Sequence, residues 1–334
     1  MYHEDLRPMG TIDVSTLASA GYDAHLLHRP DLYKVLLSRI PAENISLNKK
    51  VVEIEQDEQG VTIHTSDGKA YRGDILVGAD GSYSAVRERL FEQLDKENKL
   101  PITDKTGLTA GNICIAGTTR SLDPVKFPIV ESDHTRFMNF VGKGKAHSWM
   151  VFTLPNNRMA YIIQEQLDSN AAKDITQLRK ERLSPEAKEK FLKDVRDFHI
   201  KPDDNERNTP QGNNNNNNQP TLGDLLDATE PGLVATILLE EKMFETWYHG
   251  RTVLIGDAVH KMHLASGQGC VNAMQDAVVL TNCLYEIYAG KEPLTFERIT
   301  EAFKDYREQR YSHAKIQIEI ANLRSRILGG QVWL

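Results

Sequence analysis

The sequence is poor in cysteine, in positive charge and in long apolar runs. Three cysteines, Cys114, Cys270 and Cys283, occur among 334 residues, and their spacing fits neither a metal site nor a set of disulfides. An odd number of cysteines without a secretory signal at Met1 is typical of a reducing compartment, so we expect a cytoplasmic protein. No apolar segment is long enough to cross a bilayer. These features predict no metal site and no transmembrane segment.

The charge balance argues against a nucleic-acid partner. The formal net charge is -7 at pH 7, and the lysines and arginines form no basic stripe. Proteins that bind a phosphate backbone usually carry such a stripe. The length favours two domains over one.

A GxGxxG motif, the usual start of a dinucleotide-binding unit, is also absent. The early glycines Gly10, Gly21, Gly60 and Gly68 do not form one. The first 28 residues are weakly patterned and read as connecting chain, with no strand–helix unit before Arg29. The first predicted helix begins near Pro30 and is ended by Pro41. Its expected apolar stripe consists of Leu32, Val35, Leu36 and Ile40.

Two stretches share one pattern, an apolar strand followed by a turn with glycine and an acid and then by a helix. In the later stretch, residues 252–255 predict a strand buried on both faces, and Gly256 and Asp257 end it. Gly267 and Gly269 then precede an apolar segment, 270–289, which we expect to be a well-buried helix. A glycine pair lets a planar or anionic ligand approach the backbone, and a helix N-terminus presents free N–H groups. This stretch predicts a site for an electron-rich cofactor.

The earlier stretch runs through residues 75–77 into a turn that contains Asp80 and Gly81. Ser82 or Ser84 can cap the helix that follows, which we expect to reach about Leu94. Before it, β-rich runs at 51–54 and 61–65 and the two-residue turn signal Asp67–Gly68, beyond which 70–72 continue, predict a β region.

From Leu108 the pattern changes to short strands without helices between them, at 112–117, 136–141, 148–154 and 158–164. This predicts an inserted antiparallel sheet. Its aromatic side chains are more typical of a core than of a pocket, although one face of such a sheet is a common place for a substrate cavity. Ser184 predicts a helix cap, and Thr295 predicts the cap of a last helix, on which Ile316, Ile320, Leu323 and Ile327 continue the apolar spacing. Residues 201–220, with six consecutive asparagines, read as a disordered insertion.

Together these motifs resemble the single-component, aromatic-hydroxylase-like FAD-dependent monooxygenases. Residues 74–81, followed by Ser84 and Val86–Arg87, are similar to that family's Asp-Gly fingerprint. Residues 256–260, with Gly267, Gly269, Asn272 and Asp276–Ala277, are similar to its Gly-Asp fingerprint, and 29–32 are similar to its arginine-led helix.

The resemblance implies the α/β class with an α+β insertion. It implies an incomplete FAD/NAD(P)-binding Rossmann-like domain that carries an inserted antiparallel-sheet substrate domain. We divide the chain into 1–107 (first part of the FAD-binding domain), 108–235 (substrate domain), 236–290 (return to the FAD-binding domain) and 291–334 (C-terminal helical segment).

The resemblance also assigns cofactor-binding roles. Asp257 would accept hydrogen bonds from the ribityl hydroxyls of FAD, and Gly256 lies beside it. Gly267, Gly269 and Cys270 would bring backbone against the isoalloxazine ring. Arg29 would neutralise the pyrophosphate, while Asp80 and Gly81 belong to a turn that the family associates with FAD and reduced nicotinamide. An acid that only caps its turn is the alternative for Asp80.

The expected activity is NAD(P)H-driven hydroxylation or epoxidation of a small organic molecule with O2, through a C4a-hydroperoxyflavin. No side chain identifies itself as a catalytic base. His260 and His263 lie beside the flavin loop, and we interpret both as structural.

Two departures from the family matter. The missing GxGxxG unit predicts a fragment that starts roughly a hundred residues into such a protein, and therefore weak or no retention of FAD. The position of the family's proline after His260 holds Leu264, which predicts a freer loop.

Three alternatives stay open. The first alternative is a non-catalytic remnant that acts as a binding or regulatory protein. The second is another flavin enzyme, such as a halogenase or prenyl reductase, and the third is a plain nicotinamide Rossmann enzyme. A halogenase should show a Trp-x-Trp-x-Ile-Pro segment, which Trp149, Trp247 and Trp333 do not supply. The late position of the Gly-Asp helix argues against the plain Rossmann enzyme.

Overall fold

The structure is a computed structural model that describes residues 1–10, 21–22, 26–27, 29–132, 134–142, 147–167, 175–200, 219–290 and 294–328. The chain divides into two compact units. Unit 1 consists of Met1–Leu37, Ala110–Leu239 and Arg326–Leu334, and unit 2 of Ser38–Thr109 and Glu240–Ser325. The asparagine run lies outside the described residues. No described helix contains a stretch of the length and apolarity that a membrane span requires.

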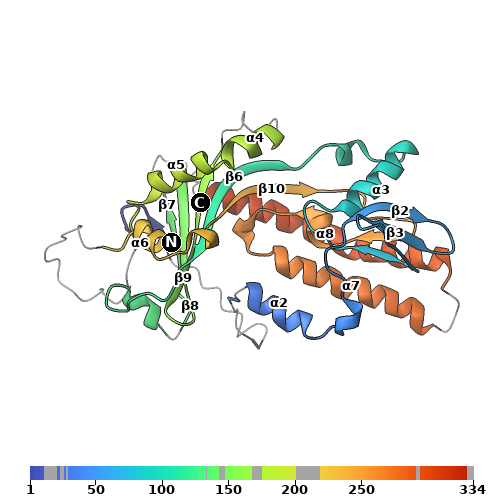
Figure 1. Ribbon diagram of the computed structural model, residues 1–334, viewed down its shortest axis with the longest axis horizontal. Coiled ribbons are helices and arrows are strands. Elements are labelled where there is room, and N and C mark those ends of the chain that lie inside the picture. Colours follow the sequence, from blue (N-terminus) through green and yellow to red (C-terminus); the bar gives the residue numbers. More distant parts are fainter. Residues whose placement is uncertain are drawn as a thin grey trace. The chain divides into compact units, whose positions relative to one another are not determined.

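Unit 1 is built on the antiparallel sheet that the sequence predicts. Its strands follow the order β1-β7-β8-β9-β6-β10, and Figure 1 labels all of them except β1. Their bounds are Tyr2–His3 (β1), Phe137–Val141 (β7), His147–Leu154 (β8), Arg158–Gln166 (β9), Thr109–Thr118 (β6) and Ala235–Met243 (β10). Trp149 pairs with Ile163 and with Phe140, so the apolar side chains of three adjacent strands lie on one face.

The aromatic residues of this sheet form a core. Phe140, Trp149 and Tyr161 are all buried, and Phe140 stacks on Trp149 with 5.4 Å between ring centroids. The helices α5 (Pro185–Val195) and α6 (Leu222–Asp227) pack Phe191, Val195 and Leu222 into the same cluster. Ser184 caps α5 as predicted, by accepting from the Ala187 N–H. The sequence did not predict the preceding helix α4, Ile175–Arg182.

The reading of the first residues as connecting chain is wrong at one point. Tyr2 and His3 form β1, which runs parallel to β7 opposite Phe140 and Val141. Tyr2 is buried, and its ring stacks on that of Phe140 at 5.5 Å. Two residues are too few for a periodic pattern, so only the buried ring distinguishes this strand from a loop.

Unit 2 contains two small sheets. In the first, β12 (Thr252–Leu254) pairs in parallel with β5 (Leu76–Gly78) and antiparallel with β11 (Tyr248–His249). The second lies in the predicted β region and is an antiparallel meander of β2 (Val51–Gln56), β3 (Val61–Thr65) and β4 (Ala70–Gly73). All three residues of β12 are buried, as its apolar sequence predicts. Lys242 and Met243, at the end of β10, pair with Lys261 and His260 of β13 (His260–Lys261).

Three long helices complete unit 2. Ser84 caps α3 (Ala85–Lys96) by accepting from the Arg87 N–H. The helices α7 (Gly269–Ala289) and α8 (Phe296–Leu328) lie against each other, since Arg298 Nη2 of α8 donates to the Ile287 carbonyl of α7 at 2.8 Å. Short 3₁₀ turns lie along the chain. They are η1 (Ala42–Asn44), η2 (Ile102–Lys105), η3 (Pro128–Glu131), η7 (Pro231–Leu233), η8 (Gly256–Ala258) and η9 (Leu264–Ser266).

Burial on three helices differs from the prediction. The expectation that α7 is well buried is wrong, because its inner face is only Asn272, Asp276, Leu280 and Cys283. Apolar side chains on the rest of the helix are exposed, namely Val271, Met274, Val278, Tyr285 and Tyr288. The short helix α2, Arg29–Leu37, ends before Pro41 and buries no side chain. On α8 the buried stripe continues through Ala314 and Ala321, while Ile316 and Leu323 are exposed. Apolar composition alone does not determine which face of a helix has a neighbour.

Candidate cofactor site

The two glycine-acid turns lie side by side at one edge of the parallel sheet. Leu254 of β12 pairs with Gly78 of β5, and the Ile255 N–H donates to the Gly78 carbonyl at 3.1 Å. Because the strands are parallel, the chain leaves both at the same edge, the usual position of a ligand site in an α/β sheet. The structure therefore brings the Asp80–Gly81 turn next to the Gly256–Asp257 turn.

Hydrogen bonds join the two turns directly. Ser82 Oγ donates to Asp257 Oδ2 at 3.4 Å. The buried guanidinium of Arg87, in the first turn of α3, donates from Nη1 to the Ala258 carbonyl and from Nη2 to the Ser82 carbonyl, both at 2.8 Å. Burial lowers the pKa of Arg87. The fingerprint in the sequence included Arg87 without a role, and a cation inside the buried face of a helix was the signal that could have found it.

Asp80 uses its carboxylate within its own turn. Oδ1 accepts from Ser84 Oγ at 2.5 Å, and Oδ2 accepts from the Val86 N–H at 3.2 Å. Asp80 thus satisfies donors at the start of α3, which is the capping role kept as the alternative for this residue. Gly81 has φ +84°, a left-handed conformation that suits glycine, and no atom lies within 4 Å of where a Cβ would be.

Asp257 points its carboxylate toward its own loop. Oδ2 accepts from Lys261 Nζ at 2.6 Å as well as from Ser82. The side chains of Asp257 and Lys261 are 32% and 28% exposed, so this carboxylate is accessible to a ligand. Gly256 is buried at φ +62°, and a Cβ there would come 3.0 Å from that of Ala273, so this position requires glycine.

The glycine pair precedes an open helix end. Gly267 has φ +65° and free space around a Cβ position, and Gln268 makes no side-chain hydrogen bond to the N-terminus of α7. The first N–H groups of α7, at Gly269 and Cys270, therefore have no side-chain cap. A helix end of this kind favours an electron-rich group.

A buried polar network lies beneath these turns. Asp276 of α7 accepts from the Gly256 N–H at 2.9 Å and contacts His260 Nε2 at 2.5 Å, both through Oδ2. Its Oδ1 accepts from Arg310 Nε of α8 at 2.7 Å. Burial by itself would raise the pKa of Asp276, but the bonds with His260 and Arg310 outweigh it and lower that pKa. The sequence singled out two histidines in the loop after Asp257. Both of them, His260 and His263, are buried.

The histidines serve the loop structure, as the sequence reading proposes. His263 Nδ1 accepts from the Ala265 N–H at 3.1 Å and caps η9, and its Nε2 lies 3.3 Å from Ser325 Oγ. Burial lowers the pKa of His263 to about 4. Leu264 begins η9, and its carbonyl accepts from the Gly267 N–H at 2.8 Å. The segment that lacks the family's proline is therefore held by hydrogen bonds.

Arg29 is not brought to this site by anything the structure describes. It begins α2, which belongs to unit 1, whereas the other seven predicted residues belong to unit 2. The structure therefore groups Asp80, Gly81, Gly256, Asp257, Gly267, Gly269 and Cys270 within one unit.

The residues of this group fit one end of FAD. An accessible carboxylate suits a polyol, because an ionised carboxylate only accepts hydrogen bonds. The uncapped start of α7 supplies N–H donors, and Gly267 leaves the space that a planar ring needs. Each of these features matches the ribityl and ring portion of the cofactor.

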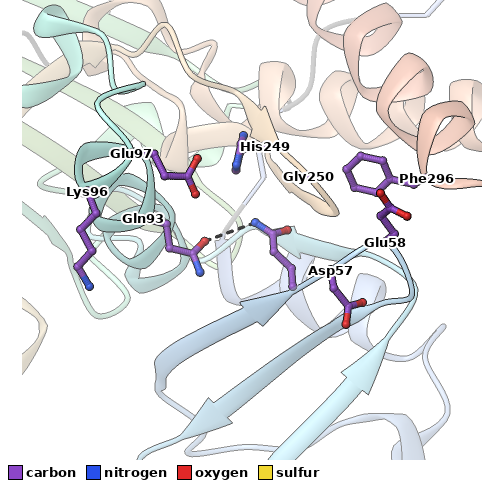
Figure 2. A pocket seen from close by; sticks show the side chains of 9 residues that line it. Asp57, Glu58, Gln93, Lys96, Glu97, His249, Gly250 and Phe296 are labelled. Atoms are coloured by element: carbon purple, nitrogen blue, oxygen red, sulfur yellow. Dashed lines mark hydrogen bonds between the residues drawn. The ribbon is translucent and has the colours of Figure 1, made fainter.

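A cavity of about 420 Å³ lies elsewhere in unit 2, at the start of β12 and away from the glycine-acid turns (Figure 2). Glu58 and Phe296 lie on one side, Lys96 and Glu97 on the other, and His249 and Gly250 between them. Burial lowers the pKa of His249. The remaining lining residues are Gln56, Asp57 and Gln93.

Among the described residues, one set brings potential metal ligands together. Atoms of Glu53, Glu55 and His64 lie within 4.8 Å of one another on the meander. His64 Nε2 is 3.8 Å from Glu55 Oε2, the distance of an ion pair, and both glutamates are exposed.

The fold of this chain is shared with solved structures of FAD-dependent hydroxylases. HpxO from Klebsiella pneumoniae, solved with FAD and uric acid, superposes with a TM-score of 0.60 at 22% identity, covering 91% of this chain and 64% of that one. The 2,6-dihydroxypyridine-3-hydroxylase from Arthrobacter nicotinovorans gives 0.64 at 15% identity, covering 90% and 70%. This likeness confirms the predicted α/β fold with its antiparallel insertion.

Sequence comparison finds similar proteins along most of this chain. Residues 198–315 match the family described as FAD binding domain. The FAD-dependent monooxygenase ptmM of Penicillium ochrochloron is 30% identical over 302 residues, covering 87% of this chain and 63% of that protein. The FAD-dependent monooxygenase verC1 of Penicillium polonicum is 27% identical over 322 residues, covering 95% and 36%. These matches confirm the resemblance to FAD-dependent monooxygenases that the motifs predict, and the chain spans less than two thirds of the length of these curated relatives.

Proposed function

We propose that this chain contributes the ring and ribityl portion of an FAD site to an NAD(P)H-driven monooxygenase, which hydroxylates or epoxidises a small organic molecule with O2. The observation that carries the proposal is the pairing of Asp257 with the uncapped start of α7 at one edge of the parallel sheet. The relatives ptmM and verC1, both FAD-dependent monooxygenases by name, support it.

In this proposal each residue has a separate task. Asp257 accepts from ribityl hydroxyls, and the N–H groups of Gly269 and Cys270 donate to the electron-rich edge of the ring. Gly267 lets the ring approach the backbone, while Gly256 and Gly81 give the turns their left-handed geometry. Asp80 acts by shaping its turn, and Arg29 is assigned to the pyrophosphate. Bound FAD supplies the redox chemistry between NAD(P)H and O2.

The second candidate is a non-catalytic remnant of such an enzyme. Two observations favour it: Asp257 already pairs with Lys261, and α7 exposes a row of apolar side chains. In the described part of unit 2, only β5 and β12 form a parallel pair. A site built on so small a sheet should hold FAD weakly. A halogenase or a prenyl reductase has no supporting observation beyond the shared turns.

Flavin binding and turnover separate these candidates. The purified chain should elute from gel filtration with little or no flavin absorption, and FAD added afterwards should bind with a measurable dissociation constant. Asp257→Ala should weaken that binding at least about tenfold, the effect of losing charge-assisted hydrogen bonds, while the exposed control Glu308→Ala should not. NAD(P)H consumption with added FAD supports the enzyme, and FAD binding without consumption supports the remnant. Equal binding by the wild type and Asp257→Ala contradicts the assigned site.

A further inference from the structure

We infer that helix α8 clamps the loop from Gly256 to Gly267 at two points, and that Asp276 and His263 are the positioning residues through which it acts. The inference rests on the proposed function only in naming what the loop is held for, which is presentation of Asp257 and the glycine pair to FAD. The clamp itself consists of contacts within unit 2.

The first point is at the start of the loop. Arg310 of α8 donates to Asp276 Oδ1, and the other oxygen of the same carboxylate accepts from the Gly256 N–H. Asp276 and Arg310 are both buried, so Arg310 depends on this carboxylate for compensation, and the carboxylate depends on Arg310 together with His260. Gly256 directly precedes Asp257. The position of the Asp257 carboxylate therefore depends on a pair that α8 completes.

Neighbouring contacts narrow the freedom of that pair. Arg310 Nη2 also donates to Asn272 Oδ1 at 2.9 Å, so the guanidinium contacts α7 through two residues. Tyr306, one turn earlier on α8, donates from its hydroxyl to the Leu254 carbonyl at 3.3 Å. The helix thus contacts both the last residue of β12 and the acid that holds the turn.

The second point is at the end of the loop. His263 Nδ1 accepts from the Ala265 N–H, which requires this nitrogen to be unprotonated, so Nε2 carries the proton and donates to Ser325 Oγ. Arg324 Nη1 donates to the Ser266 carbonyl at 3.3 Å. Two adjacent residues of α8 therefore contact η9 just before Gly267 and the start of α7.

The loop has little regular structure of its own to replace these contacts. It contains two single 3₁₀ turns, η8 and η9, and the two-residue strand β13. Leu264 supplies no backbone restriction of the kind that proline gives. The contacts from α8 are the compensation for that freedom.

Hydrogen exchange measured by mass spectrometry on the protein without added FAD tests the clamp. Ser325→Ala should speed exchange in 263–267 about tenfold, the effect of one neutral hydrogen bond, and leave 252–258 unchanged. Arg310→Met should speed exchange in 252–258 and leave 263–267 unchanged. Its effect should exceed that of Ser325→Ala, because it removes the cationic partner of a buried carboxylate. The matched controls are Ser312→Ala and Lys315→Met, which change exposed positions of the same helix.

The design remains informative if Arg310→Met does not fold. Ser325→Ala removes one hydroxyl at a half-buried position, and His263→Asn, which keeps an acceptor for Ala265 but loses the contact to Ser325, should give the same regional increase. The second point is overturned if Ser325→Ala and His263→Asn both exchange in 263–267 at the rate of the control Ser312→Ala. The first point is overturned if a folded Arg310→Met variant shows unchanged exchange in 252–258.

An FAD titration of the same variants separates this inference from the proposed function. Weaker binding in Ser325→Ala than in Ser312→Ala shows that the clamp serves the cofactor. A wild type that binds no FAD contradicts the proposed function, while the exchange pattern still decides whether α8 clamps the loop.

Discussion

The two units bury polar groups in different ways. Among the described residues, the buried polar side chains of unit 1 are all neutral, namely Asn112, Thr119, Ser148, Thr153, Gln164 and Thr229. All the buried aspartate, glutamate and arginine side chains of the described residues lie in unit 2, namely Arg87, Asp104, Glu240, Arg251, Asp276 and Arg310. Both units have an apolar core with aromatic rings in contact, but unit 2 also buries charged groups that are held by specific donors and acceptors.

This difference predicts different responses to substitution. Apolar cores tolerate replacements that conserve volume, whereas removing one partner of a buried polar pair leaves the other without compensation. Unit 2 should therefore be the more sensitive of the two, and its sensitive residues should lie near the glycine-acid turns.

The largest expected effect compares one buried acceptor in each unit. Asp104 accepts from the N–H groups of Glu245 and Thr246, each at 2.8 Å, and Thr153 Oγ accepts from the Arg136 N–H at 2.9 Å. Asp104→Ala leaves two donors unpaired and should cost about 4 kcal/mol of unfolding free energy, against about 1 kcal/mol for Thr153→Val. Urea unfolding followed by circular dichroism measures both. Equal losses would remove the distinction between the units.

A pH effect of about 3 kcal/mol should come from His263 in unit 2. Its folded pKa of about 4 lies below the ordinary value of 6.5, so between these values the unfolded chain binds a proton that the folded chain does not. Stability should therefore fall as the pH drops from about 6.5 to about 4, and this residue should contribute no slope above that range. His263→Asn should flatten the curve, and an unchanged curve would show that another group is responsible.

The next comparison, with smaller expected losses of stability, is between two glycines of unit 2 that have similar φ angles. Gly256→Ala must keep φ near +62° and place a Cβ 3.0 Å from that of Ala273, so a loss of about 2 kcal/mol is expected. Gly267→Ala meets the same backbone strain in open space, and about 1 kcal/mol is expected. Thermal unfolding of the two variants makes the comparison. A larger loss of stability for Gly267→Ala than for Gly256→Ala would contradict the assigned steric clash at Gly256.

The smallest effect concerns thiol reactivity and should leave stability unchanged. Cys270 is exposed at the start of α7, whereas Cys114 of unit 1 and Cys283 of unit 2 are buried. Burial raises the pKa of Cys114 to about 12 and also raises that of Cys283. A thiol reagent should label one cysteine per folded chain, identified by peptide mapping as Cys270. Rapid labelling of Cys283 but not Cys114 would indicate that unit 2 opens locally.

Local signals in the sequence predicted the elements well. Ser84 and Ser184 cap the helices expected of them, and the turn at Asp67–Gly68 joins β3 to β4. Each of these features depends on residues within a few positions of one another, which is why propensity and turn chemistry suffice. The adjacency of the two glycine-acid turns was not predicted, because it depends on the parallel pairing of β5 with β12, which are far apart in the sequence.

Contacts between distant segments were not predictable in the same way. Asp276 and Arg310 are 34 positions apart, and Arg87 and Ala258 are 171 apart. Arg310 did leave a trace, because it occupies a position on the buried stripe of α8 between Tyr306 and Ala314. A charged residue at such a position implies a buried partner but does not identify it. The exposed face of α7 left no trace, since its residues are as apolar as those of a buried helix.

The contacts of Asp257 have a consequence for how a ligand would meet it. Lys261 and Ser82 both donate to one oxygen of this carboxylate, Oδ2, within unit 2. A side chain that is already ordered loses little rotamer freedom on binding, a loss that otherwise opposes association by about 0.5–1.5 kcal/mol per side chain. The ammonium group also competes with an incoming hydroxyl for one carboxylate oxygen. Asp257 is therefore preorganised and partly masked at once, and salt, which weakens an exposed ion pair, should shift the balance toward the ligand.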